Sequence, residues 1–303
     1  MIHGQHLLSL GARMHFPKFW ALATAHSDSA TGERVTVKAY GWSDLSKDEA
    51  QQRAQQRATQ AAKRRSDQSD VSERSQYDEY AATPLREPAV ERVFAEGNEV
   101  AVISRNRYGA LVLNCPSTMF VDIDFPAVAA DGFLDHLKMM FSAGHRAKRI
   151  AQVEEQTLDR VRDWFAHHPE ASGRLYRTHS GLRVLLCHRE FDPDSPAAMT
   201  VLEELCSDPL YRSLTRRQSC FRARLTPKPW RCGCDQPPSR YPFLKESDQD
   251  RHQEWESKYL RASERFATCR LIETVGPATQ AEPFQTIVQY HDSLACESEQ
   301  PLA

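Results

Sequence analysis

The chain has 303 residues, with 39 Lys and Arg against 41 Asp and Glu, which gives a net charge of −2. This balance excludes a wholly basic nucleic-acid coat protein and a strongly acidic tail protein, so any nucleic-acid site must be a local patch. No apolar run approaches the roughly 20 residues that a membrane helix needs, and the N-terminal apolar run is broken by Gly11 and Arg13. We therefore expect a cytoplasmic protein with no membrane partner.

The first 80 residues are expected to form a hairpin-helix unit that ends in a polar linker. Residues 19–25 and 35–40 have the pattern of two strands joined by a polar loop. Ser46 and Glu49 have the spacing of a capping box, which predicts a helix from there to Arg65. Its small-residue face predicts that the helix lies flat on a sheet; this face consists of Ala50, Ala54, Ala58, Ala61 and Ala62. Residues 66–80 are polar and are expected to be a linker or surface loop.

After Pro84 and Pro88 the pattern becomes strand-rich, and residues 81–292 are expected to form a larger α+β domain. The first three strands are close in sequence, which predicts an antiparallel meander of residues 100–104, 110–114 and 118–124. The expected elements that follow are a helix at 151–167, strands at 174–177 and 182–187, a helix at 196–206, a strand at 219–225, a helix at 247–264 and a strand at 266–272. Residues 293–303 are expected to be a frayed tail.

The sharpest local signal is a pair of carboxylates on the strand Phe120–Asp124. Residues two apart on a strand point to the same face, so Asp122 and Asp124 project together while Val121 and Ile123 enter the core. Paired oxygen ligands suit Mg²⁺ or Mn²⁺, and such pairs hold the metals of phosphoryl-transfer sites. The alternative is an exposed strand end whose aspartates cap the following turn.

A second signal is the turn between the strands at 174–177 and 182–187. Gly181 permits close approach of the backbone, and Ser180 offers a hydroxyl group. Arg177, His179 and Arg183 bring cationic or protonatable groups to the same turn. These groups predict a cradle for phosphate. The alternative is an ordinary hairpin with an exposed histidine.

A third signal is the basic segment that contains Arg222, Arg224, Lys228, Trp230 and Arg231. From Arg174 to Arg231 the chain has eleven Lys and Arg against six Asp and Glu, a local charge of +5. Arginine combined with an aromatic side chain fits stacking and phosphate contact with a nucleotide or a single strand. The alternative is that these arginines form ion pairs with Asp122, Asp124 and other surface acids.

These three motifs, in this order over residues 98–245, resemble the archaeo-eukaryotic primase-polymerase superfamily. The resemblance implies an RRM-like antiparallel or mixed sheet with a DxD metal pair, a histidine in the second motif and a third acidic residue. Asp122 and Asp124 match the first motif. Arg183 stands where the family has its histidine, with His179 inside the turn, and the strand Phe221–Arg224 has no acid.

The principal functional hypothesis is a divalent-metal-dependent nucleotidyltransferase that acts on nucleotides or single-stranded nucleic acid. Its expected catalytic residues are Asp122, Asp124 and His179, with Mg or Mn held by the two aspartates. Its expected phosphate ligands are Arg177, Ser180, Arg183, Arg222, Arg224 and Lys228. Two alternatives stay open: a non-catalytic nucleotide- or nucleic-acid-binding module on the same fold, and an α+β protein-interaction module that uses the N-terminal helix.

Overall fold

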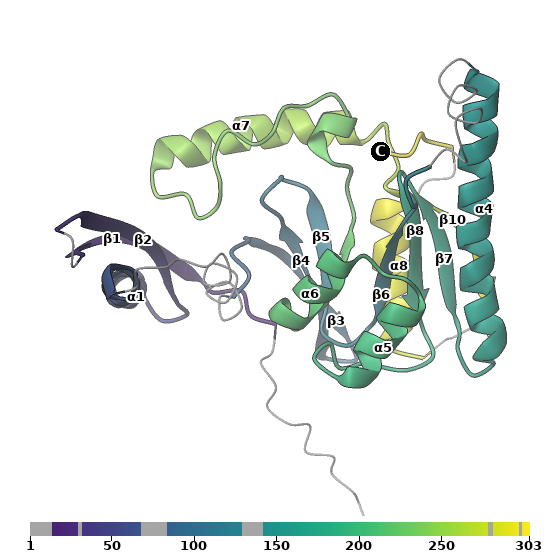
Figure 1. The fold of residues 1–303 in the computed structure, drawn as a ribbon, viewed down its shortest axis with the longest axis horizontal. Coiled ribbons are helices and arrows are strands. Elements are labelled where there is room, and N and C mark those ends of the chain that lie inside the picture. Colours follow the sequence, from purple (N-terminus) through teal and green to yellow (C-terminus); the bar gives the residue numbers. More distant parts are fainter. Residues whose placement is uncertain (1–13, 30–31, 68–83, 129–141, 278–280, 297–298) are drawn as a thin grey trace, which may run out of the picture.

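The computed structural model describes residues 14–29, 32–67, 84–128, 142–277, 281–296 and 299–303. The described elements are helices and antiparallel sheets, which confirms the α+β class (Figure 1). In chain order they are β1 (Phe19–Asp28), β2 (Arg34–Ser43), α1 (Lys47–Asp67), β3 (Ala89–Ala95), β4 (Asn98–Arg105), β5 (Leu111–Cys115), β6 (Phe120–Asp124), α4 (Ala143–His167), β7 (Gly173–Thr178), β8 (Gly181–Leu186), α5 (Pro196–Glu204), α6 (Pro209–Gln218), β9 (Phe221–Arg224), η1 (Pro229–Arg231), α7 (Glu246–Ser263), β10 (Cys269–Val275) and α8 (Phe284–Ala295). None of the described helices combines the length and the apolar character needed to span a bilayer.

The N-terminal hairpin-helix unit is present as expected. β1 and β2 pair antiparallel along their whole length, and α1 packs on this two-stranded ribbon. The buried face of α1 consists of Ala50, Ala54, Ala58 and Ala62, because only small side chains let the helix lie so close to the ribbon. A Cβ atom on Gly41 of β2 would overlap the backbone of Ala54, so this glycine sets the contact distance. Residues 68–80 of the expected linker lie outside the described residues.

The larger unit contains two four-stranded antiparallel sheets, with strand orders β3-β4-β5-β9 and β10-β7-β8-β6. The expected three-stranded meander is therefore wrong in its third strand. β4 and β5 pair as expected, but β6 leaves them and pairs with β8 in the other sheet. The unpaired edge of β5 is taken by β9 instead, which brings the basic strand into the first sheet.

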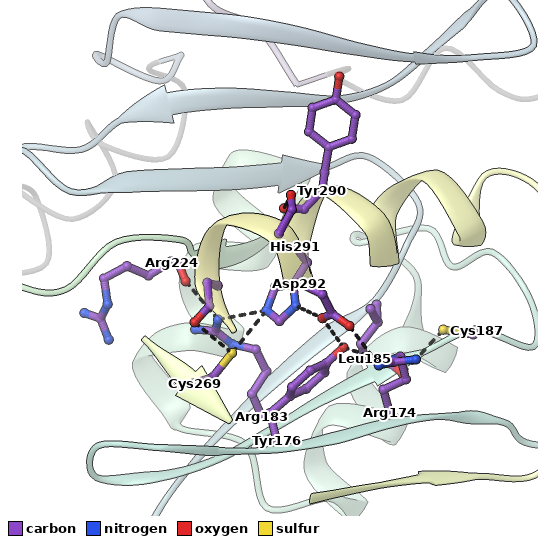
Figure 2. Close-up of polar contacts among 12 residues, drawn as sticks. Arg174, Tyr176, Arg183, Leu185, Cys187, Arg224, Cys269, Tyr290, His291 and Asp292 are labelled. Carbon is purple, nitrogen blue, oxygen red and sulfur yellow. Dashed lines mark hydrogen bonds and ion pairs between the residues drawn. The ribbon is translucent and has the colours of Figure 1, made fainter. Parts of the chain in front are cut away.

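Helix α8, which the sequence patterns did not predict, lies between the two sheets (Figures 1 and 2). Its Tyr290 hydroxyl donates to Glu91 of β3 over 3.1 Å, and its His291 is fully buried against the second sheet. Helix α4 lies along the second sheet, and its Val161, Trp164 and Phe165 belong to the main core. The two sheets thus share one apolar core, and polar groups of α8 are enclosed within it.

The tail that was expected to fray is instead tied to the core over the residues that the structure describes. α8 continues to Ala295, and residues 299–303 are also described. The amide of Ala303 donates to the carbonyl of Ala267 over 3.0 Å, and the Ala303 side chain is buried. The C-terminal residues therefore add a short parallel bridge beside β10.

We predict that Ala54→Leu destabilises the hairpin-helix unit, because the added atoms have no room between α1 and β2. Overpacking of this kind costs about 1–3 kcal/mol. Gln55→Leu is the matched control, since Gln55 is the exposed neighbour on the same helix. Thermal unfolding followed by circular dichroism measures both variants. Equal stability of the two variants would contradict the close contact.

Candidate functional site

The first two motifs, the aspartate pair and the turn before Gly181, meet because β6 and β8 are neighbours. Their antiparallel register places Asp122 opposite Arg183 and Asp124 opposite Gly181. Val121 and Ile123 are buried while Asp122 and Asp124 are not, so the two carboxylates share a face as predicted. A Cβ atom on Gly181 would overlap the carbonyl oxygen of Ile123, so glycine is needed at this crossing. The order of the motifs predicts that the strand after Gly181 neighbours the aspartate strand, and the pairing of β8 with β6 confirms this prediction.

Asp122 and Arg183 form an ion pair that the sequence analysis did not expect. The Nε atom of Arg183 lies 3.0 Å from Oδ1 of Asp122. The Arg183 side chain is 1% exposed, whereas the Asp122 side chain is 35% exposed. Arg183 was expected to bind phosphate, but a phosphate from solvent does not reach a side chain so deeply buried. Asp122 was expected as a free metal ligand, but it instead neutralises a buried guanidinium.

The buried guanidinium of Arg183 also contacts β9 and α8 (Figure 2). Its Nη1 donates to the carbonyl oxygen of Arg224 over 2.9 Å and lies 3.2 Å from Nε2 of His291. A guanidinium only donates hydrogen bonds, so Nε2 of His291 must present its lone pair. His291 is therefore neutral and carries its proton on Nδ1, which donates to Oδ1 of Asp292 over 2.9 Å. Burial lowers the pKa of His291, in agreement with a neutral ring.

Asp292 closes this buried network at the β7 side of α8. Its carboxylate accepts a hydrogen bond from the Tyr176 hydroxyl over 2.7 Å and pairs with Nη2 of Arg174 over 2.8 Å. Burial alone would raise the pKa of Asp292, but the hydrogen bonds from His291 and Tyr176 lower it. Two ion pairs, Asp122–Arg183 and Arg174–Asp292, are thus linked through one neutral histidine. Figure 2 shows this histidine between Arg183 and Asp292.

Asp124 is the exposed carboxylate of the pair, and a third carboxylate lies near it. Burial of the Asp124 group, followed by the charges of Asp208 and Asp122, raises its pKa. Asp208 is the N-cap of α6, where Oδ2 accepts from the amide of Tyr211 over 2.9 Å. The amide of Asp208 donates to the carbonyl of Asp122 over 3.2 Å, which fixes the α6 terminus against β6. Sequence reasoning missed Asp208, although an Asp directly before Pro209 is a recognisable helix start.

Three cations face these carboxylates from β9 and the segment after it. Burial and the charge of Arg183 lower the pKa of Arg224 to about 10. Burial, followed by the charges of Arg224 and Arg231, lowers the pKa of Lys228. Burial also lowers the pKa of Arg231. Within the described part of the chain, the buried Nε of Arg224 has no hydrogen-bond partner. We call Arg224, Lys228 and Arg231 the cationic edge.

His179 and Ser180 connect the β7–β8 turn to the cationic edge. Nη2 of Arg231 donates to the Ser180 hydroxyl oxygen over 3.0 Å, and that oxygen lies 2.8 Å from Nδ1 of His179. The hydroxyl proton is then free to point at Nδ1, which leaves the proton of neutral His179 on Nε2. Burial and the charges of Arg231 and Arg177 lower the pKa of His179. The β7–β8 turn and the basic segment therefore meet at this point.

Two further residues expected to bind phosphate are occupied by structural contacts. Arg222 pairs with Glu87 over 2.6 Å, and both side chains are largely buried. Arg177 pairs with Glu154 of α4 over 2.6 Å and lies over the ring of Phe125. Of the expected phosphate ligands on the basic segment, Arg222 is therefore excluded, because its guanidinium is held by Glu87, which also accepts from Ser104 of β4. The alternative of pairing with acids holds for Arg222.

The described residues contain no group of three or more His, Cys, Asp or Glu side chains placed to hold a metal ion by themselves. A hollow of about 360 Å³ exists elsewhere, on the opposite face of β6, where Ile123, Trp164 and Leu205 line it. This hollow has none of the site residues in its wall, because Asp122 and Asp124 point to the other face.

Comparison with known protein families, with curated proteins and with solved structures gave no match to this chain. The resemblance to the primase-polymerase superfamily therefore stays a prediction that depends on the motifs alone.

We predict that Arg183→Met lowers the free energy of unfolding by about 3–5 kcal/mol, since it leaves Asp122 and His291 without their shared partner. Arg261→Met, at an exposed position of α7, is the control and should be nearly neutral. Denaturant titration of both variants measures the difference. An Arg183 variant as stable as the control would show that the buried guanidinium is dispensable.

The buried neutral His291 predicts a stability that falls in mild acid. Below the ordinary histidine pKa of about 6.5, the unfolded chain takes up a proton that folded His291 resists. The free energy of unfolding should therefore decrease as the pH falls from about 7 to 5. His291→Asn keeps a polar group but does not titrate. The difference in the free energy of unfolding between the native chain and this variant should therefore become smaller toward acid pH. A difference independent of pH would contradict a neutral His291.

Proposed function

We propose that this chain binds the polyphosphate of a nucleotide, with a divalent cation, at the edge formed by Asp124, His179 and the cationic edge. The reaction that this site would serve is nucleotidyl transfer. In contrast to the hypothesis from the sequence, Arg183 and Arg222 hold the fold together here and do not bind phosphate.

The observation that supports the proposal is a cluster of three cations, Arg224, Lys228 and Arg231, that form no ion pair with the acids of the described residues although Asp124 lies near them. The pKa values of Arg224, Lys228 and Arg231 are all lowered; burial is the first cause for each, and repulsion from neighbouring cations adds to it for Arg224 and Lys228. Binding of an anion would reduce the electrostatic repulsion within this cluster. A polyphosphate brings several negative charges at once. Arg224 and Arg231 supply guanidinium forks, which suit phosphate oxygens, and Lys228 supplies a point charge.

The carboxylates fit a cation that arrives with the nucleotide. Mg²⁺ is usually held by one or two carboxylates together with substrate phosphates, rather than by a cage of protein ligands. The raised pKa of Asp124 reflects repulsion from Asp208 and Asp122 in addition to burial, and a bound cation would relieve that repulsion. Asp124 would be the principal ligand, because one oxygen of Asp122 is committed to Arg183. When bound, the metal would polarise the phosphate at which transfer occurs.

A non-catalytic nucleotide-binding module is the second candidate, and the Asp122–Arg183 pair favours it. Two-metal transfer sites need carboxylates that are free to bridge cations, and here one of the pair is partly neutralised. Incubation of the chain with a primed strand, a nucleoside triphosphate and Mn²⁺ distinguishes the two candidates. Extension or labelling of the strand supports transfer, and tight binding without any product supports the non-catalytic module.

Lys228→Met should weaken binding of a nucleoside triphosphate by roughly five- to ten-fold and reduce the salt dependence of that binding, because one charge contact is lost. Lys258→Met is the matched control, since Lys258 is an exposed lysine of α7 paired with Glu254. Calorimetric titration over a series of salt concentrations provides both quantities. Identical affinities and salt slopes for the two variants would remove Lys228 from the site.

The Asp124→Asn variant tests the contribution of the cation separately from that of the phosphate contacts. Loss of one negative charge leaves the cationic edge less neutralised, so binding of the triphosphate in the presence of chelator should strengthen. The gain in affinity on adding Mg²⁺ should disappear, because the principal ligand is gone. Asp159→Asn, at an exposed position of α4, is the control and should retain the native response to Mg²⁺. A native Mg²⁺ response in Asp124→Asn would refute the assigned ligand.

A further inference from the structure

An aromatic pair, one ring exposed and the other half-buried, lies directly beside the cationic edge. Trp230, in the short helix η1, is 46% exposed, which is unusual for so large an apolar side chain. Tyr108, from the turn between β4 and β5, packs edge-on against it with ring centroids 5.3 Å apart and an interplanar angle of 84°. One ring thus supports the other, and nearly half of the Trp230 side chain stays accessible to a ligand. We call Trp230 and Tyr108 the aromatic platform.

Cations lie against both rings of the platform. Nζ of Lys228 lies 5.6 Å from the centre of the Trp230 ring, and the guanidinium carbon of Arg107 lies 4.6 Å from the centre of the Tyr108 ring. Arg231 follows Trp230 directly and donates to Ser180 in the β7–β8 turn. The platform is therefore continuous with the cationic edge, and its charge complements an anion that carries flat apolar groups.

The platform is held in place before any ligand arrives. Pro229 is buried at the start of η1, and the amides of Cys232 and Cys234 both donate to its carbonyl oxygen, over 3.1 and 2.9 Å. In the other turn, the amides of Tyr108 and Ala110 donate to the side-chain oxygen of Asn106. Because both supporting turns are fixed by hydrogen bonds, little conformational entropy is lost when a base stacks on the indole.

We propose that the aromatic platform binds a base of a single-stranded nucleic acid whose phosphates follow Lys228 and Arg231. The inference rests on the proposed function, and it adds a strand to the nucleotide at the same edge. Base stacking on an aromatic side chain tolerates any sequence, because every base has a π-face. Alternation of flat bases and negative phosphates matches the alternation of Trp230 with its flanking cations, and an acidic peptide would leave the indole unused.

The test compares two strands with equal phosphates, a short oligothymidylate and an abasic strand of the same length, by fluorescence anisotropy. The native chain should bind the oligothymidylate roughly ten-fold or more tightly than the abasic strand, which matches the range of stacking effects per base. Trp230→Ala should abolish this preference without changing the salt slope, since no charge is removed. Trp230→Phe should restore part of it. Leu244→Ala, at another exposed apolar side chain, should behave as the native chain.

The outcomes distinguish this inference from the proposed function. If the native chain binds both strands equally, or binds neither, or if Trp230→Ala keeps the preference, the platform inference is overturned. Binding of a nucleoside triphosphate with Mg²⁺, measured on the same preparations, tests the proposed function separately. Loss of base preference in Trp230→Ala together with no triphosphate binding by any form would uphold the platform and overturn the proposed function. Circular dichroism and thermal unfolding check that each variant is folded.

Discussion

The guanidinium of Arg183 is a positive charge enclosed at the junction of four elements. From β8 it reaches Asp122 on β6, the carbonyl of Arg224 on β9 and His291 on α8. Removal of such a charge from water is expensive, and it is tolerated only where ion pairing and hydrogen bonding are nearly complete. The positions of the two sheets and of the helix between them are therefore coupled, because moving any of the four elements would leave this charge with fewer partners.

The arrangement of the candidate site follows from that junction. Arg183 donates to the carbonyl of Arg224 and so fixes the end of β9. The segment that follows then passes beside β6 and β8, where its cations lie near Asp124. The charge of Arg183 itself also contributes to the lowered pKa of Arg224. The buried cation thus occupies one carboxylate and repels a neighbouring guanidinium, and the half-buried groups of the cationic edge keep lowered pKa values. In the function proposed above, a polyphosphate with its own divalent cation would offset this positive charge.

Local patterns predicted much of the fold because they depend on neighbouring residues. The alanine face of α1, the capping at Ser46 and the alternation along β6 are all signals of short range, and each is present in the structure. Pairing of β6 with β8 was expected from motif order. Departure of β6 from the β4–β5 pair was not, because the choice between two available edges depends on contacts far apart in the sequence.

The parts of the site that sequence reasoning missed depend on the same long-range contacts. Asp208 has an ordinary helix-capping pattern, and only the α6 terminus packing on β6 brings it near Asp124. His291 lies in a segment whose helix was not expected, and nothing nearby in sequence identifies its partner. In the sequence, Arg183 and Arg222 each alternate with apolar neighbours along a strand, which is the pattern of a cation on a surface. Their burial follows from the placement of Asp122 and Glu87, and a single sequence gives no measure of either distance.

The most direct test of this account is a crystal structure of the chain with Mn²⁺ and a non-hydrolysable nucleoside triphosphate. The anomalous signal of manganese locates the cation independently of the protein atoms. The account predicts a manganese peak at Asp124, with the triphosphate in contact with Lys228 and Arg231 and with Arg183 still paired to Asp122. A triphosphate bound in the hollow beside Trp164, or a manganese ion bound away from Asp124, would contradict it.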